Sequence, residues 1–284
     1  LTHHNHLQAA TKAFRRVTDL KPRSPEGWLS LVENLYQVGQ RRAAEDAMRN
    51  ARINLSETFA HITLARCYEI ASNQAELTTT QRSLHIARAE QFYLQALANG
   101  PDDRAVLQKS AAFYVSINRR KSALQQIERL LEGVEPYDTG ADSLTTWARR
   151  SKAALLSASG SFQDYMTAVD EIRKNVPTGA RLGPDDLRVL AQITLTRTDS
   201  LSHKKVIQDF EDFQQERKLT DEEQILLANL YDRVGRNDDS EKLLYDLLAT
   251  NPDNLQVVSM LIEILVKQKR NDQAEALLRK LPAS

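Results

Sequence analysis

The chain has 284 residues, of which 41% are apolar and 27% charged, and this composition excludes an intrinsically disordered or membrane-spanning chain. The 38 basic and 38 acidic residues balance, which argues against nonspecific binding to nucleic acid or to anionic membranes. Nine glycines and eight prolines are too few for an all-β chain, whereas the abundant Ala, Leu, Gln, Glu and Arg residues favour helices.

Helix-forming segments follow one another along the whole chain. In chain order, we predict a leading helix at residues 2–22 and helix pairs at residues 25–57, 58–102, 104–137, 143–179, 184–219, 221–253 and 255–283, about fifteen helices in all. Glycine follows the first helix of three pairs, at Gly39, Gly160 and Gly235, and proline closes four units, at Pro22, Pro101, Pro177 and Pro252. Glycine suits the position just past a helix end, and proline ends a helix.

Two residue patterns recur in these units. A small residue followed four positions later by a bulky one occurs at Ala10/Phe14, Ala44/Met48, Ala89/Tyr93, Ala123/Ile127, Ser240/Leu244 and Ala274/Leu278, and Tyr165/Val169 and Val206/Phe210 extend the series. The first helices carry a small residue and a large one three positions later, at Ala65/Tyr68, Ala111/Tyr114, Ala153/Leu156 and Ala228/Tyr231. The spacings from 10 to 44, 89 to 123 and 240 to 274 are each 34 residues. A fixed period of this size indicates a repeat architecture.

Three segments depart from the regular pattern. Residues 72–86 are an insertion, which forms either a lengthened helix with a longer turn or a loop over the concave face of the array. Residues 134–143 and 176–184 are rich in proline and glycine and border a divergent unit, where the array can bend. We nevertheless predict a single solenoid over residues 1–284, because neighbouring units share one continuous core.

The recurring residues resemble the tetratricopeptide repeat pattern. The unit that begins at Pro25 has Trp28, Leu31, Val32, Leu35, Gly39, Ala44, Met48 and Ala51 at the family's positions, and the unit that begins at Asp221 has Leu227, Ala228, Tyr231, Gly235, Ser240, Leu244, Leu247 and Pro252. The resemblance covers nearly the whole chain. It implies an all-α fold, a right-handed α-solenoid of stacked helix-turn-helix repeats, with about seven repeats and a leading helix.

No sequence pattern points to catalysis, so we predict that the protein is not an enzyme and holds no cofactor and no metal. Nucleophile-elbow, phosphate-loop and zinc-protease motifs are absent. Cys67 falls on a predicted first helix, where a buried inert thiol is expected. His3, His4 and His6 lack a neighbouring Cys or carboxylate ligand. The pairs Asp102–Asp103, Asp185–Asp186 and Asp238–Asp239 stand at helix starts, where carboxylates cap free amides.

The resemblance also implies where a partner binds. In such arrays the second, fifth, ninth and twelfth residues of each unit line the concave groove. In the unit at 143–179 the count begins at residue 146, and the corresponding residues are Trp147, Arg150, Ala154 and Ser157. Among these positions we single out Glu33, Tyr36, Arg66, Gln108, Trp147, Arg150, Arg188 and Asn229 as partner-binding candidates. Trp147 and Arg150 are the best anchor, since Trp and Arg dominate binding hot spots, although Trp147 can instead pack between repeats. The Lys–Asn pair with which one subclass grips chaperone tails is missing.

These features predict a non-catalytic interaction scaffold that binds a peptide or protein partner in its groove, with no nucleic-acid partner and no membrane insertion. A second interpretation is a substrate-recruiting or regulatory region of a larger enzyme or of a secretion or assembly machine. Self-association through the ends of the array is a third. The single cysteine slightly favours the cytoplasm over the periplasm and leaves the compartment open.

Overall fold

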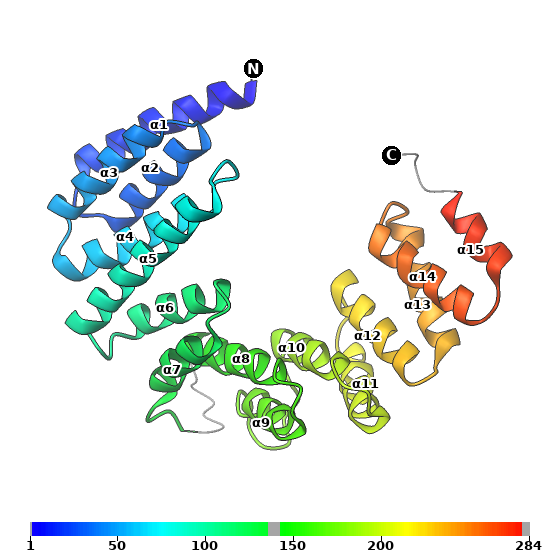
Figure 1. The fold of residues 1–284 in the computed structure, drawn as a ribbon. Coiled ribbons are helices and arrows are strands. Elements are labelled where there is room, and N and C mark those ends of the chain that lie inside the picture. Colours follow the sequence, from blue (N-terminus) through cyan, green and yellow to red (C-terminus); the bar gives the residue numbers. More distant parts are fainter. Residues whose placement is uncertain (1, 136–142, 280–284) are drawn as a thin grey trace. The chain divides into compact units, whose positions relative to one another are not determined.

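The computed structural model describes residues 2–135 and 143–279, and within these ranges the chain forms fifteen α-helices and no strand (Figure 1). The helices are α1 (Thr2–Leu20), α2 (Pro25–Gln37), α3 (Arg41–Asn54), α4 (Glu57–Ser72), α5 (Thr79–Asn99), α6 (Arg104–Ser116), α7 (Arg120–Leu131), α8 (Ser143–Ser157), α9 (Phe162–Arg173), α10 (Pro184–Leu195), α11 (Ser200–Gln214), α12 (Asp221–Arg233), α13 (Asn237–Thr250), α14 (Leu255–Lys267) and α15 (Asn271–Leu278). The predicted helix number and the all-α class are confirmed. The predicted unit ends at 137 and 283 lie outside the described residues.

The helices group into two compact units, Leu1–Glu132 and Gly133–Ser284. Their boundary lies next to the Pro/Gly-rich segment at 134–143, where the sequence predicted that the array can bend. A single solenoid over the whole chain stays a prediction.

In the first unit, every helix packs against the next one in the chain, and first helices also pack against each other. The pairs α2–α4 and α4–α6 make these contacts between repeats. The small residues of the recurring pattern, Ala44, Ala89 and Ala123, are completely buried. Because they lack long side chains, the helices approach closely at these positions, which gives the α-solenoid its regular stacking. Cys67 is buried too, and burial raises the pKa of its thiol to about 12, as expected for an inert cysteine.

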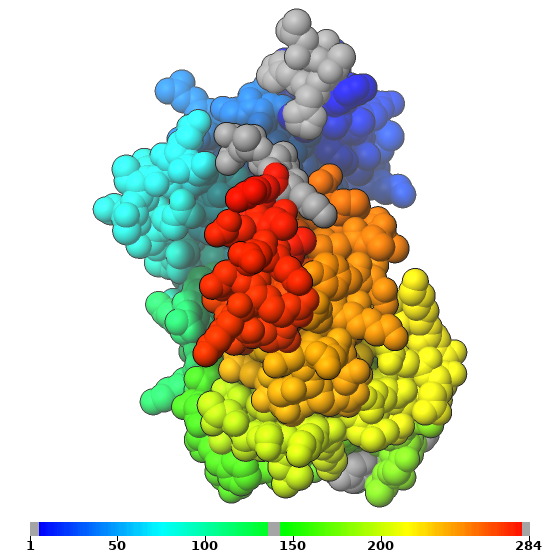
Figure 2. All heavy atoms as spheres, turned by 90° about the vertical axis from the view of Figure 1, so that its right-hand side faces the viewer, coloured from blue at the N-terminus to red at the C-terminus, as the bar shows by residue number. Residues whose placement is uncertain are grey.

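The second unit stacks in the same way. First helices meet in the pairs α8–α10 and α10–α12, and α13 packs on α14, which packs on α15 (Figure 2, orange and red). Its largest core cluster includes Tyr165, Leu187, Phe210 and Leu230, all nearly inaccessible to solvent. In the last recurring pair, Ala274 is buried, whereas its bulky partner Leu278 at the end of the eight-residue helix α15 is 51% exposed.

Helix ends follow the predicted capping chemistry. Thr220 accepts a hydrogen bond from the Glu223 backbone amide, and the Glu223 carboxylate accepts one from the Thr220 amide, so the two residues form a capping box. Asp103 caps α6 through the amides of Ala105 and Val106. Gly235 has φ +79°, a left-handed conformation that ends α12 and that other residues adopt only with strain.

The insertion at residues 72–86 lengthens a helix and does not form a loop. It completes α4, forms the turn at residues 73–78 and adds the first residues of α5. A capping box between Thr78 and Gln81 fixes the N-terminus of α5. Helix α5 has 21 residues, whereas the equivalent second helices α3, α7, α9, α11 and α13 have 12 to 15. Of the two interpretations, the lengthened helix with a longer turn is confirmed.

Candidate partner-binding surface

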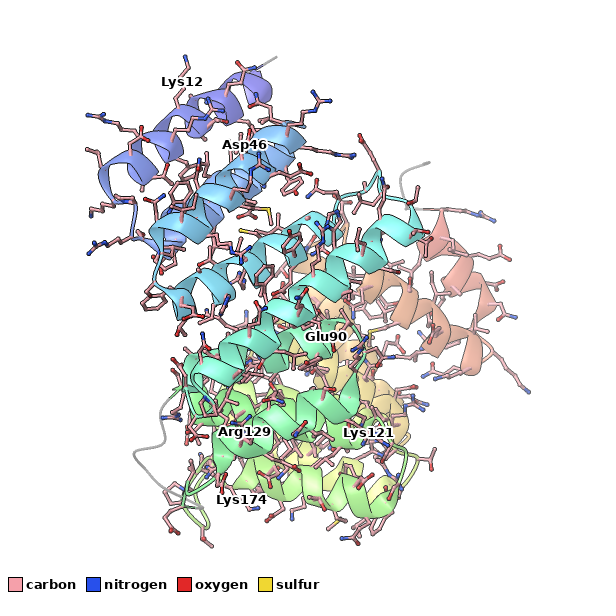
Figure 3. All side chains as sticks on the ribbon, turned by 60° about the vertical axis from the view of Figure 1, so that its left-hand side comes forward. Lys12, Asp46, Glu90, Lys121, Arg129 and Lys174 are labelled. Atoms are coloured by element: carbon pink, nitrogen blue, oxygen red, sulfur yellow. The ribbon has the colours of Figure 1, made fainter. Side chains whose placement is uncertain are left out.

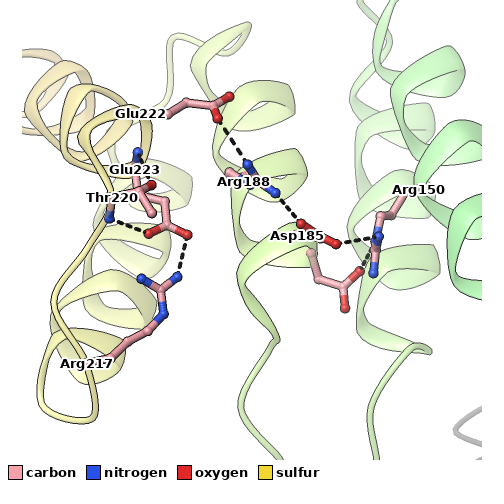
Figure 4. A network of polar contacts seen from close by, with 8 residues as sticks. Arg150, Asp185, Arg188, Arg217, Thr220, Glu222 and Glu223 are labelled. Atoms are coloured by element: carbon pink, nitrogen blue, oxygen red, sulfur yellow. Dashed lines mark hydrogen bonds and ion pairs between the residues drawn. The ribbon is translucent and has the colours of Figure 1, made fainter. Parts of the chain in front are cut away.

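A continuous row of ion pairs crosses three successive first helices of the second unit (Figure 4). Arg150 on α8 donates from Nε to Asp186 Oδ1 at 2.7 Å, and one of its terminal nitrogens lies 3.2 Å from Asp185 Oδ2. Arg188 on α10 contacts Asp185 and donates to Glu222 Oε2 on α12 at 3.0 Å. The row therefore links four predicted groove positions, at residues 150, 185, 188 and 222.

The local sequence explains why the charges alternate. Pro184 occupies the first turn of α10, and Asp185 and Asp186 follow it there, where the helix dipole favours negative charge. Arg188 lies three positions after Asp185, so both face the same side of α10. The hydrogen bond from Arg188, followed by the positive charges of Arg150 and Arg188, lowers the pKa of Asp185 below its usual range. Asp185 is therefore ionised at neutral pH.

Other predicted groove residues continue along the same helices. Trp147 is half-buried and lies one turn before Arg150 on α8. Asn229 on α12 donates its side-chain amide to Ile225 O at 3.1 Å and lies 3.7 Å from the sulfur of Met260 on α14. Groove positions of α12 thus also contact α14.

In the first unit, Arg66 belongs to a second cluster of charges. The cluster forms around Glu69, which accepts a hydrogen bond from the Tyr93 hydroxyl. Burial raises the pKa of Glu69, while the Tyr93 hydrogen bond and the positive charges of Arg66 and Lys109 oppose the shift. Gln108 precedes Lys109 on α6 and is half-buried.

The remaining two candidates of this unit differ in exposure. Glu33 on α2 is exposed, as a groove residue is expected to be. Tyr36 is only 9% exposed and lines a cavity between α3 and α5. Burial, followed by the charge of Glu45, raises the pKa of the Tyr36 hydroxyl to about 12, so this side chain is a neutral hydrogen-bonding group.

Two features of this surface could not be found in the sequence. The first is Arg149, which adjoins Arg150 in the sequence but is only 2% exposed and donates to Lys174 O at 2.6 Å and Glu135 O at 2.9 Å. The second feature is the ion pair between Arg150 and Asp186. The Asp186 side chain is only 6% exposed, so a glutamate at position 150 would place a second carboxylate beside it. Arg150→Glu therefore perturbs the fold as well as the surface.

Acid is expected to destabilise the second unit partly through Glu223. Burial alone would raise the pKa of this carboxyl, but hydrogen bonds from Arg217 and Thr220 outweigh it and lower the pKa below 4.5. The ionised form therefore stabilises the folded state above pH 4.5, and this contribution is lost as the pH falls through the lowered folded-state pKa. Glu223→Gln keeps the capping group and removes the charge. When thermal unfolding is measured from neutral pH to below 4.5, the melting temperature should decrease less for the variant than for the unaltered protein. Equal decreases would contradict this role of Glu223.

Comparisons with known proteins agree with the repeat geometry. Residues 224–284 match the family model of the tetratricopeptide repeat. The fold is similar to that of yeast Tom70, with a TM-score of 0.54 and 16% identity over 98% of this chain and 55% of that chain. It is also similar to PilF of Pseudomonas aeruginosa, with a TM-score of 0.50 and 17% identity over 84% of this chain and 97% of that chain. The chain therefore has a helical repeat fold of the tetratricopeptide type, and the family match itself covers residues 224–284.

This tetratricopeptide-type chain spans about half the length of the Tom70 chain, and identities of 16% and 17% show the fold alone. The sequence matches no curated protein at a significant level. Solenoids of this type present extended surfaces and generally act as non-catalytic scaffolds for protein partners. None of the helices in the described residues is long and apolar enough to cross a membrane. Within the same residues no three His, Cys, Asp or Glu side chains form a metal-binding group, and the side chains of His3 and His4 lie outside them.

Proposed function

We propose that this protein is a non-catalytic scaffold that binds a peptide or protein partner along its first helices. The observation that carries the proposal is the row of ion pairs from Arg150 through Arg188 to Glu222, which crosses three successive repeats (Figure 4). In the first unit, Glu33, Arg66 and Gln108 would contact the partner, and in the second unit Trp147, Arg188 and Asn229 would do so.

The ion pairs suit recognition because they hold the charged groups in place while leaving them accessible. The side chains of Asp185 and Glu222 are 52% and 60% exposed, and that of Arg188 is 34% exposed. Each can therefore accept or donate a further hydrogen bond to a partner without losing its present one. Side chains that are already ordered lose little entropy on binding, so such a surface binds with little rearrangement. Trp147 adds an apolar contact beside the charges.

A blocking experiment tests this proposal. Ala154 on α8 and Gln192 on α10 are exposed groove positions, so the double variant Ala154→Arg/Gln192→Arg places two bulky cations on the first-helix surface without touching the core. The control Gln163→Arg/Ala249→Arg makes the same changes at exposed positions of the second helices α9 and α13. Changes at exposed positions shift stability by only about 0.5 kcal/mol.

Peptides are first selected on the unaltered protein from a displayed random library, and their affinities for both variants are then measured by calorimetry. We expect the blocking variant to weaken binding at least about tenfold, which corresponds to about 1.4 kcal/mol, and the control to leave it unchanged. A selected peptide that binds both variants equally would contradict the first-helix surface. If the control alone loses binding, the second helices would be the binding surface instead.

A further inference from the structure

A cavity of about 230 Å³ opens between the second helices α3 and α5 of the first unit, and none of its lining residues belongs to the row of ion pairs described above. Figure 3 looks onto these two helices, which are marked by Asp46 and Glu90. The residues that line the cavity are Tyr36, Glu45, Met48, Arg49, Arg52, Leu64, Tyr68, His85, Arg88 and Phe92. They come from four helices of one unit, so the cavity depends on the packing of that unit alone.

Stacked rings form one wall of this cavity. The Tyr68 and Phe92 ring centres lie 5.7 Å apart with planes inclined by only 10°, and the His85 ring also stacks with Tyr68, at 6.0 Å between ring centres. All three side chains remain partly accessible to solvent. Met48 and Leu64 add buried apolar surface. Partly exposed ring edges and faces are the groups on which another aromatic ring packs favourably.

Positive charge dominates the rim. Arg49 and Arg52 reach it from α3 and Arg88 reaches it from α5, against a single lining carboxylate, Glu45. The Arg88 guanidinium lies 5.5 Å from the Tyr68 ring centre, and it donates to the Tyr68 hydroxyl at 3.4 Å. Arg49 is paired with Asp46, and the exposed Arg52 stands one helical turn further along α3. Guanidinium groups placed in this way bind carboxylates through paired hydrogen bonds.

The insertion in the sequence builds part of this site. His85 belongs to the first turns of α5, which lie within the inserted residues 72–86 and lengthen this helix relative to the other second helices. The ring nitrogen His85 Nδ1 is buried and has no hydrogen-bond partner among the described residues. The insertion at residues 72–86 thus supplies His85, which lines the cavity and has a ring nitrogen without a hydrogen-bond partner among the described residues.

We propose that this cavity binds an acidic peptide segment that carries one aromatic side chain. The volume is sufficient, since a cavity of about 150 Å³ accepts benzene. The aromatic side chain enters against Tyr68 and Phe92, and the flanking carboxylates of the peptide pair with Arg52 and Arg88. Its lining includes none of the residues proposed above to contact a partner along the first helices, although Tyr36, Leu64 and Tyr68 come from the first helices α2 and α4.

Methionine methyl groups give a direct test. The chain has three methionines, of which Met48 lines the cavity, while Met166 and Met260 belong to α9 and α14. With 13C-methyl-methionine protein, the peptide acetyl-EEFEE-amide should shift the Met48 signal in a saturable manner and leave the other two in place. Acetyl-EEGEE-amide, which lacks the ring, and acetyl-KKFKK-amide, which reverses the charge, should each bind at least about tenfold more weakly.

Three variants separate charge recognition from loss of structure. Arg52→Glu/Arg88→Glu should weaken EEFEE binding at least about tenfold, whereas Arg42→Glu, on the same helix α3 but outside the cavity, should change it less than twofold. Glu45→Gln removes the opposing charge and should strengthen binding about twofold, an effect that misfolding cannot produce.

The outcomes distinguish this proposal from the first-helix surface. A Met48 signal that stays unshifted by EEFEE, or that responds equally to KKFKK, would overturn the acidic-aromatic site. A shift of Met260 alone would also overturn it and would instead support binding near Asn229, which contacts the Met260 sulfur. If adenosine monophosphate shifts Met48 and EEFEE does not, the site recognises a nucleotide and the peptide proposal is wrong.

Discussion

Replacing Arg149 by methionine is expected to lower the free energy of unfolding of the second unit by about 3 kcal/mol. The guanidinium is 2% exposed and donates to the carbonyls of Lys174 and Glu135. Lys174 is the residue that ends α9, where carbonyls have no partner within the helix and the dipole favours a cation. Each buried carbonyl that loses its donor destabilises the fold by roughly 1–3 kcal/mol, so two such losses outweigh the relief of removing a buried charge.

Urea unfolding followed by circular dichroism measures this effect. Arg149→Lys keeps the charge but lacks the planar fork of donors, so its stability should fall between those of the unaltered protein and the methionine variant. Arg233→Met, at an exposed arginine of α12, controls for the chemical change and should shift stability by only about 0.5 kcal/mol. A methionine variant at position 149 that is as stable as this control would show that the two hydrogen bonds contribute nothing.

The repeat architecture could be predicted because it depends on local, periodic signals. Burial of Ala44, Ala89 and Ala123 follows directly from their recurrence, and the Thr220–Glu223 capping box follows from a four-residue motif. Such features need only helical spacing and capping chemistry, which the sequence shows without knowledge of the distant neighbours.

The surface was harder to predict because its chemistry depends on contacts between repeats. Arg150 was expected to be available to a partner, but it is held by Asp186 of the next first helix, 36 positions later in the chain. Tyr36 was expected in the groove, but it lines the cavity between α3 and α5. Helical periodicity predicts on which face of its own helix a residue lies. It does not predict which residue of the next repeat contacts it.

Arg149 is the clearest example of a residue whose surroundings could not be predicted from the sequence. It is next to Arg150 in the sequence, yet one guanidinium is buried against backbone carbonyls and the other belongs to a row of exposed charges. Adjacent residues on a helix point about 100° apart, so they face different surroundings. A buried arginine on the face shared with Thr145 and Ala148 breaks the usual rule that such faces are apolar, and only the carbonyls that it meets explain it.

Enlarging Ala111 to leucine is expected to destabilise the first unit by about 1–3 kcal/mol. Ala111 has no exposed surface and belongs to the small-residue pattern of the first helices, at a position of α6 where the helix packs among α4, α5 and α7. A leucine side chain has three more carbon atoms than alanine. It can fit there only if the helices separate or if the leucine leaves its preferred rotamer.

The adjacent residue provides a matched control for this test. Ala112 is exposed on the same helix, so Ala112→Leu makes an identical chemical change with the same effect on helix propensity and without overpacking. Thermal unfolding should therefore separate the two variants by several degrees, with Ala112→Leu close to the unaltered protein. Equal melting temperatures would mean that the solenoid core tolerates a wider spacing of helices at this repeat. The close approach of helices would then not depend on a small residue at this position of each first helix.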